Sequence, residues 1–156
     1  MSRPFWPYWI LYNKAAVDVP LDKLVPCSPN NPIPSYVVGV FNQLTTHPQP
    51  GYAYYNGRSF SCGYFIVETQ KVLVSDHYYF LAGGNVSFRP NKQVPEDQWF
   101  KVGTTKDNKP VYIGTVYTGT EEICGPVIDG VCNAAFKGLL RYPESENYKV
   151  LALNAE

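Results

Sequence analysis

The chain lacks any apolar run close to the roughly 20 residues that an α-helix needs to cross a bilayer. Charged residues are also scarce, at 17% of the 156 residues against about 25% in a typical globular chain. The 13 basic and 13 acidic side chains cancel, and the basic ones are scattered rather than clustered. We therefore expect no transmembrane segment and no nucleic-acid partner, because electrostatic capture of nucleic acid needs a basic patch.

Histidine and cysteine are too few and too dispersed for a metal site. The chain has two histidines, and its four cysteines form no Cys-x-x-Cys pair, a spacing typical of zinc ligands. We expect no metal and no other cofactor. Cys124 and Cys132 would pair across a turn in an oxidising compartment. We place the protein in the cytoplasm, with non-classical secretion left open, and there both cysteines are expected to be free and buried.

Signatures of catalysis are missing as well. No Gly-x-x-x-x-Gly-Lys loop for phosphate occurs in the chain. A nucleophile–base pair would have to combine Cys62 with His47 or His77, and none of the three lies in a family-type signature. We therefore predict that the protein is not an enzyme.

Aromatic residues, proline and glycine are abundant instead. The chain has 13 Tyr, 8 Phe and 3 Trp, together with 14 Pro and 12 Gly. Runs of β-branched and aromatic residues bounded by Pro and Gly favour many short strands, and no long amphipathic helix pattern occurs. The segment Val131–Leu140 has apolar residues at helical spacing, but its correspondence to His77–Ala82 favours a strand.

The strand predicted at Pro110–Gly119 has a counterpart earlier in the chain. When residues 112–117 are superposed on residues 55–60, the tyrosine, the glycine and the last aromatic residue coincide, so that Gly114 matches Gly57. An apolar strand ending in Val-Gly precedes each copy, and a glycine-marked turn and a second apolar segment follow it. Four landmarks in the same order indicate two diverged repeats of one β unit.

These repeats define the expected organisation. The first spans residues 36–89 and the second 99–156, with a linker at 90–98 and an N-terminal arm and Pro-rich loop at 1–35. Each repeat alone is too small to bury much core. We therefore predict an all-β fold in which two pseudo-symmetric repeats pack into one compact, sandwich-like domain, with residues 57 and 114 in equivalent places.

An ordered set of short motifs resembles the DM-nine repeat family over about residues 36–153. The family includes mannose-binding lectins of invertebrate immunity, and similar repeats occur at the front of natterin-type toxins. The resemblance implies a compact β fold of two repeats. Its motifs in this sequence are Ile33-Pro34-Ser35-Tyr36-Val37-Val38-Gly39, Tyr55-Asn56-Gly57-Arg58, Lys71, Gly83-Gly84 and Tyr148-Lys149-Val150-Leu151.

The resemblance also implies a sugar site. In the lectins, a carboxylate two residues after the early glycine and a lysine beyond the Tyr-x-Gly-Arg strand hold the sugar by charge-assisted hydrogen bonds. The carboxylate positions are occupied by Phe41 and Thr105, and Pro126 lies where the second lysine would be. The candidate ligand-binding residues are Lys71 and Glu68 near the family's first lysine, Asn42 and Asp107 beside the carboxylate positions, and Arg58 of the Tyr-x-Gly-Arg motif.

Each candidate has a structural alternative. Lys71 and Glu68 would otherwise be solvated surface charges, and Asn42 and Asp107 would be turn residues. Arg58 would otherwise pair with an acid in the core between the repeats.

The function expected from the resemblance is that of a carbohydrate-binding, lectin-like protein that recognises mannose-type glycans in innate recognition. Because only one repeat keeps its lysine, a monomer would carry one site, and useful avidity would require a homodimer. The alternative is a non-catalytic protein-interaction or structural module that has lost the sugar site.

Overall fold

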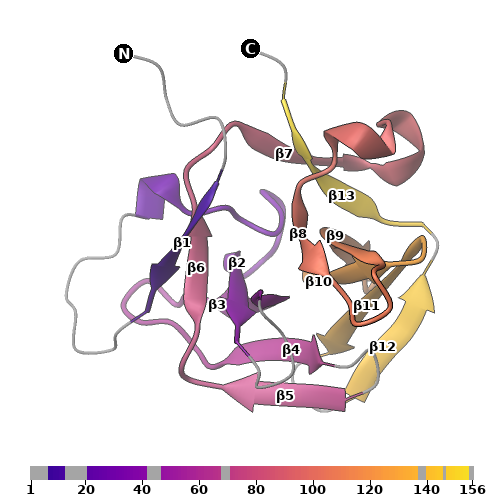
Figure 1. Cartoon of the computed structure of the whole chain (residues 1–156). Helices are drawn as coiled ribbons and strands as arrows, with labels where there is room; N and C mark the ends of the chain where they lie inside the picture. The colour runs from indigo at the N-terminus through magenta and orange to yellow at the C-terminus, as the bar shows by residue number, and fades with distance from the viewer. Residues whose placement is uncertain are drawn as a thin grey trace.

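The computed structural model of the chain describes residues 7–12, 21–41, 47–67, 71–136, 140–145 and 147–154. Over these residues it contains strands and short 3-10 helices but no α-helix, which confirms the predicted all-β class (Figure 1). The 3-10 helices are η1 (Leu21–Lys23), η2 (Asn91–Gln93) and η3 (Glu96–Gln98). The strands are β1 (Tyr8–Leu11), β2 (Ser35–Val40), β3 (Gln49–Tyr54), β4 (Gly63–Val67), β5 (Lys71–Ser75), β6 (Tyr79–Ala82), β7 (Val86–Pro90), β8 (Lys101–Thr104), β9 (Pro110–Tyr117), β10 (Glu122–Ile128), β11 (Val131–Phe136), β12 (Leu140–Ser145) and β13 (Lys149–Leu153).

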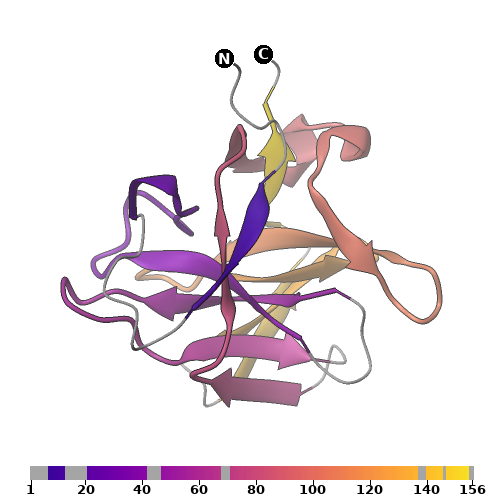
Figure 2. The same cartoon turned by 60° about the vertical axis from the view of Figure 1, so that its left-hand side comes forward.

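The strands form two antiparallel sheets that pack as a sandwich. The first sheet has the order β1-β6-β2-β3-β4-β5, and the second has the order β7-β13-β9-β10-β11-β12, with β8 added beside β9. The two orders are the same when β1 is matched to β7. Moreover, β3 packs on β10, β4 on β11 and β5 on β12 (Figures 1 and 2). Strands that pack against their own counterparts are what a pseudo-twofold axis produces.

Sequence and burial agree with this matching. Residues 34–41 read Pro-Ser-Tyr-Val-Val-Gly-Val-Phe and residues 110–117 read Pro-Val-Tyr-Ile-Gly-Thr-Val-Tyr, with the same burial class at the seven positions from 35 and 111 onward. Residues 78–82 and 148–152 both read Tyr-x-x-Leu-Ala, again with the same burial. The duplication therefore relates β2 to β9 and β6 to β13.

Two glycines occupy equivalent places in the duplication. Gly51 pairs with Val38 in the β2–β3 ladder, and Gly125 pairs with Gly114 in the β9–β10 ladder. A Cβ added to Gly51 would collide with the backbone oxygen of Tyr64, and one added to Gly125 would collide with that of Asn133. Each half thus uses a glycine where the neighbouring strand approaches closely.

The predicted equivalence of Gly57 and Gly114 is wrong. Gly57 lies in an exposed turn after β3, where its φ of 97° suits glycine, whereas Gly114 is buried in the middle of β9. β3 ends at Tyr54 because the Asn56 side chain accepts hydrogen bonds from the backbone amides of Arg58 and Ser59, which makes a turn.

The structure also divides the chain differently from the predicted boundaries. β7, placed in the first repeat, pairs with β13 of the second sheet. In the segment taken as an arm and loop, β1 pairs with β6, and Leu24 forms a bridge to Ala82. The counterpart of that bridge joins Trp99 to Ala152. The matching halves are therefore residues 8–82 and 86–153, because strand pairing extends to both ends of each.

The main core lies between the two sheets and includes fully buried Val37 of β2 and Ile113 of β9. Side chains that alternate with these along the first sheet, such as Val38, form a second cluster on its other face. Tyr12 covers that cluster and stacks on Tyr78, with ring centroids 4.9 Å apart. Burial of each such aliphatic side chain contributes about 1.5–3 kcal/mol.

Candidate functional site

The segment at residues 24–31 crosses from the first half to the second and is fixed there at two points. Cys27 forms a disulfide with Cys124 of β10, with their Cα atoms 6.0 Å apart. Asn31 binds the backbone of Glu122 on both sides: its Oδ1 accepts from the amide at 2.7 Å, and its Nδ2 donates to the carbonyl at 2.9 Å. Together these links hold the loop against the first three residues of β10.

The disulfide corrects the cysteine expectations. Cys124 is neither free nor paired with Cys132; it joins Cys27, 97 positions earlier, because the segment at residues 24–31 runs beside β2, where the Cys27 amide donates to the Ser35 carbonyl at 2.9 Å, and lies against β10. Cys132 is a free, buried cysteine, and burial raises the pKa of its thiol well above the ordinary value. Cys62 is free and half-buried.

A polar cluster lies beside this crossing. The Glu122 carboxylate accepts hydrogen bonds from the Ser28 hydroxyl at 2.8 Å, from the Thr115 hydroxyl at 3.3 Å and from the Lys149 ammonium at 3.3 Å. The Glu122 side chain is only 13% exposed, whereas that of Lys149 is 43% exposed. A carboxylate has about four lone-pair sites and an ammonium has three donors, so both groups keep hydrogen-bonding capacity for a ligand.

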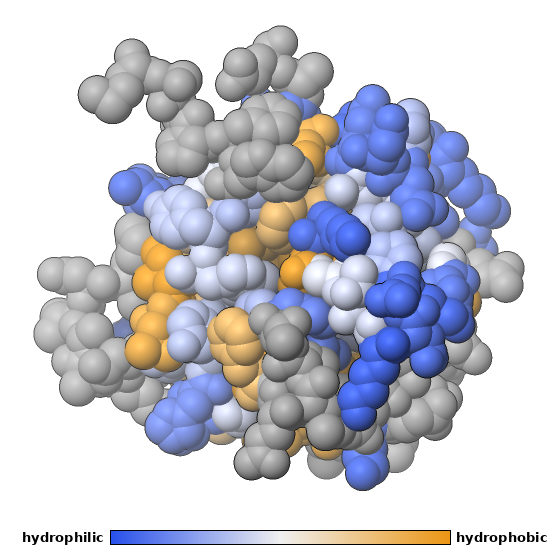
Figure 3. Space-filling model, viewed as in Figure 1, coloured by the Kyte–Doolittle hydropathy of each residue, from blue (hydrophilic) through white to orange (hydrophobic). Residues whose placement is uncertain are grey.

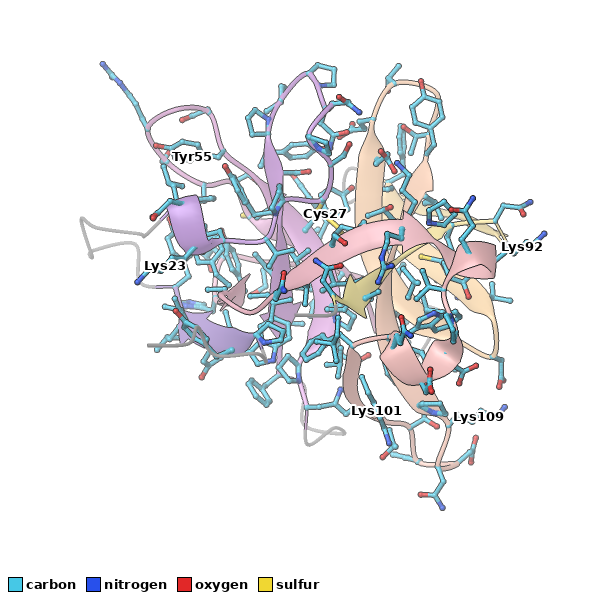
Figure 4. All side chains as sticks on the ribbon, turned by 90° about the horizontal axis from the view of Figure 1, so that it is seen from above. Lys23, Cys27, Tyr55, Lys92, Lys101 and Lys109 are labelled. Carbon is cyan, nitrogen blue, oxygen red and sulfur yellow. A yellow bond between two sulfur atoms is a disulfide. The ribbon has the colours of Figure 1, made fainter. Side chains whose placement is uncertain are left out.

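The cluster opens into a cavity of about 360 Å³ between the segment at residues 24–31 and β7. Glu122 and Lys149 supply its charged wall, and Phe88 of β7 supplies an aromatic one. Figure 4 views this region from above, with β7 crossing beside the segment that carries Cys27. The volume lies within the range of about 300–1,000 Å³ that is usual for small-molecule sites.

The neighbouring carboxylate belongs to the core instead. Glu121 is buried and accepts a hydrogen bond of 2.6 Å from the Tyr54 hydroxyl across the interface between the sheets. Burial, and after it this hydrogen bond, raises the pKa of Tyr54 well above its ordinary value. Glu121 directly precedes β10 and Glu122 is its first residue; because successive residues of extended backbone point to opposite sides, the two carboxylates have separate roles.

The corresponding place in the first half is filled. The strand matching puts Gly39 where the second half has Thr115, Pro48 where it has Glu122, and Trp9 where it has Phe88. A Cβ added to Gly39 would lie 2.6 Å from Pro48 and 2.8 Å from the Trp9 ring. Trp9 and Pro48 thus pack directly on the backbone of β2, in the place that corresponds to the polar cluster at Thr115 and Glu122.

The cavity combines charged, polar and aromatic side chains. Its lining includes the Glu122 carboxylate, the Lys149 ammonium, two serine side chains and partly buried Phe88, a set that can offer hydrogen bonds to several hydroxyl groups and contact to an apolar C–H face. Most glycoside hydrolases use two carboxyl groups that flank the bond. Among the described residues that line the cavity, Glu122 supplies one, and Glu121 is committed to Tyr54.

The structure does not gather the residues predicted to bind a sugar. Lys71 is exposed at the start of β5, Arg58 is exposed in the turn after β3, and Asp107 is exposed in the turn between β8 and β9. None of these three lines the cavity at Glu122 and Lys149. Asn42 and Glu68 lie outside the described residues. The alternative for Arg58, an ion pair in the core between the repeats, is wrong because its side chain is at the surface.

The histidines occupy unrelated places. His47 is buried, with Nδ1 at 3.0 Å from the Pro48 carbonyl and Nε2 at 3.1 Å from the Thr104 carbonyl. His77 is exposed beside Asp76. Within the described part of the chain, no three His, Cys, Asp or Glu side chains are grouped to hold a metal ion. Nor does that part contain a helix long and apolar enough to span a membrane.

Sequence reasoning missed Ser28, Thr115 and Glu122, and it named Lys149 only as part of a strand motif. A usable signal lay in the repeats themselves. Where the first half has glycine, proline and tyrosine on matched strands, the second has Thr115, Glu122 and Lys149. Polar or charged residues at positions where the other half has glycine, proline or tyrosine indicate a site that one half has and the other lacks.

No protein-family model matches the chain, and no curated protein matches it. The resemblance to the DM-nine repeat family therefore rests on the motifs and stays a prediction. The fold itself, two matched antiparallel sheets packed as a sandwich, is independent of that resemblance.

Proposed function

We propose that the protein is a non-catalytic, lectin-like carbohydrate-binding protein whose site is the cavity at Glu122 and Lys149, with mannose-type glycans as its ligands. The observation that carries the proposal is a nearly buried carboxylate, 3.3 Å from an ammonium group, in the wall of a cavity of about 360 Å³. Vicinal sugar hydroxyls require an acceptor and a donor in a fixed relation, and charge makes both hydrogen bonds stronger.

Pre-organisation supports the same proposal. Ser28 and Thr115 hold the Glu122 carboxylate in place before any ligand arrives, and the disulfide at Cys27 fixes the loop that supplies Ser28. Binding then loses little free energy to the ordering of these side chains, a cost that would otherwise weaken the affinity for a sugar. Phe88 offers a surface for the apolar face of a pyranose ring.

The test is titration of mannose-rich glycans, on an array and then by calorimetry, against two matched pairs of variants. Glu122→Gln and Lys149→Met should abolish measurable binding. Their controls are Glu121→Gln, which alters the carboxylate that faces the core, and Lys109→Met, which alters an exposed lysine paired with Asp129 at 2.6 Å. Both controls should bind as the wild type does, provided that circular dichroism shows an intact fold.

A further variant locates the site. If Lys71→Ala abolishes binding and Lys149→Met leaves it unchanged, the sugar lies at β5, as the family resemblance implies. If the wild-type protein folds but ignores every mannose-rich glycan, the lectin proposal is wrong. The chain would then be better explained as a protein-interaction or structural module.

Self-association is the second part of the proposal. One open site per chain gives weak binding, because single sugar contacts are weak and avidity requires several linked sites. Exposed apolar side chains are available for contact between copies. On the face seen in Figure 3, apolar surface forms separate areas rather than one patch. We expect a homodimer, measurable by light scattering, that persists in Lys149→Met. A strict monomer that agglutinates no mannose-coated particle would contradict this expectation.

A further inference from the structure

A second cavity, of about 460 Å³, lies next to the one at Glu122 and Lys149. Its walls are η1, the turn between β6 and β7, and the ring of Tyr8, which is 40% exposed. Gly83 and Gly84 form that turn with φ values of 70° and 72°. A Cβ on Gly83 would collide with the Tyr8 ring, so the glycine lets the ring lie directly against the turn.

The two cavities share part of their walls. Val25 and Pro26 from the crossing segment and Val86 from β7 line both of them. These residues come from residues 22–30 and residues 83–88, so the two cavities adjoin between these segments, and we call the pair of cavities the groove. Asp22 and Lys23 of η1 both line the far end of this groove, and Figure 4 shows Lys23 at the edge of the fold.

Each end of the groove has the components for one sugar ring. At one end stand Phe88 and the charged pair of Glu122 and Lys149; at the other stand Tyr8 and Asp22. The shared middle is apolar, with Val25 at 7% exposure. A single pyranose would leave one aromatic wall and one carboxylate unused, whereas a chain of linked rings would contact both.

We infer that the groove binds a linear oligosaccharide, with one ring at Glu122 and Lys149 and a following ring at Tyr8 and Asp22. The inference rests on the proposed function, because it assigns the length of the ligand to the same site. It makes the protein selective for glycan chains over free monosaccharides.

The experiment compares methyl α-mannoside with a linear α-mannotetraose by calorimetry on the full chain. The tetrasaccharide should bind the wild type about tenfold more tightly, beyond the statistical advantage of carrying several rings. Tyr8→Ala and Asp22→Asn should each weaken tetrasaccharide binding by about three- to tenfold and leave methyl α-mannoside binding unchanged. Asp22 is exposed on a short 3-10 helix, so Asp22→Asn preserves the fold even if Tyr8→Ala does not.

The outcomes separate the two claims. Equal affinity for both sugars, or variants that weaken both sugars equally, would overturn the extended groove and leave the proposed function standing. Failure of both sugars to bind would overturn the proposed function and the groove together. Loss restricted to the tetrasaccharide supports the inference.

Discussion

Ser28 donates a hydrogen bond of 2.8 Å to the carboxylate of Glu122, 94 residues further along the chain and in the opposite half of the molecule. The candidate site thus exists only where the two halves meet. Its loop comes from the first half, and its carboxylate, ammonium and aromatic wall come from the second. Any change that loosens the contact between the halves should weaken ligand binding even if it lies outside the cavity.

Removal of the disulfide is the most direct change of this kind. In Cys27→Ser/Cys124→Ser, the unfolded chain regains the freedom of a loop of 97 residues, which should lower the free energy of unfolding by about 2–4 kcal/mol. Ser28 loses its covalent neighbour, so glycan affinity should fall as well. Urea unfolding with calorimetry measures both. Cys62→Ser serves as the control, since Cys62 is free; equal midpoints in the double variant and the control would contradict the prediction.

Asn31 is the second attachment of the same loop. Asn31→Ala removes the partners of the Glu122 amide and carbonyl, and loss of a buried backbone partner costs about 1–3 kcal/mol. Asn30→Ala, at an exposed position in the same turn, should change stability little. Thermal unfolding of the two variants tests this, and similar unfolding temperatures would show that the loop does not depend on Asn31.

The matched glycines give a test of the duplication. Gly125→Ala forces a Cβ onto the Asn133 backbone and should cost about 3 kcal/mol, with a similar loss for Gly51→Ala at Tyr64. Gly57→Ala meets nothing within 4 Å and carries only the strain of its positive φ, about 1 kcal/mol. Chemical denaturation ranks the three; a Gly57 variant as unstable as the other two would argue against the strand matching.

The fold class was predictable because short apolar and aromatic runs between prolines and glycines leave few alternatives to strands. The repeat was also detectable, but the alignment that matched Gly57 to Gly114 was wrong. Gly114 is required because Val127 and Cys132 press against its backbone, whereas Gly57 is required by a turn conformation. The same residue type served two physical purposes, and sequence alone does not separate them. The better alignment, residues 34–41 with 110–117, was present in the sequence.

The site was much less predictable, for a physical reason. Glu122 follows Glu121 directly, and only the direction in which each side chain points makes one a core acceptor and the other a cavity wall. That direction depends on the strand register. Ser28 belongs to a loop whose destination depends on how the two halves pack, which no local pattern encodes.

Alkaline pH should destabilise the protein through its buried tyrosines. Tyr78 is 1% exposed and donates a hydrogen bond of 2.8 Å to the Ser61 carbonyl. Burial, and after it the neighbouring Tyr12, raises the pKa of Tyr78 well above its ordinary value of 10.0. Below pH 10 the hydroxyl is protonated in both states, so its full contribution to stability is present. Above pH 10 the unfolded chain releases this proton while the folded chain keeps it, and stability falls by about 1.4 kcal/mol per pH unit for each such group.

The prediction is that Tyr78→Phe loses about 1 kcal/mol at neutral pH, the value of one hydrogen bond, but declines less steeply than the wild type above pH 10. Val38→Ala is the matched control: it destabilises the same buried cluster without removing a titratable group, so its curve of unfolding free energy against pH should run parallel to that of the wild type. Urea unfolding at intervals from pH 8 to about pH 12 gives the three curves. A Tyr78→Phe curve as steep as the wild type above pH 10 would show that this hydroxyl ionises equally easily in the folded and unfolded chains.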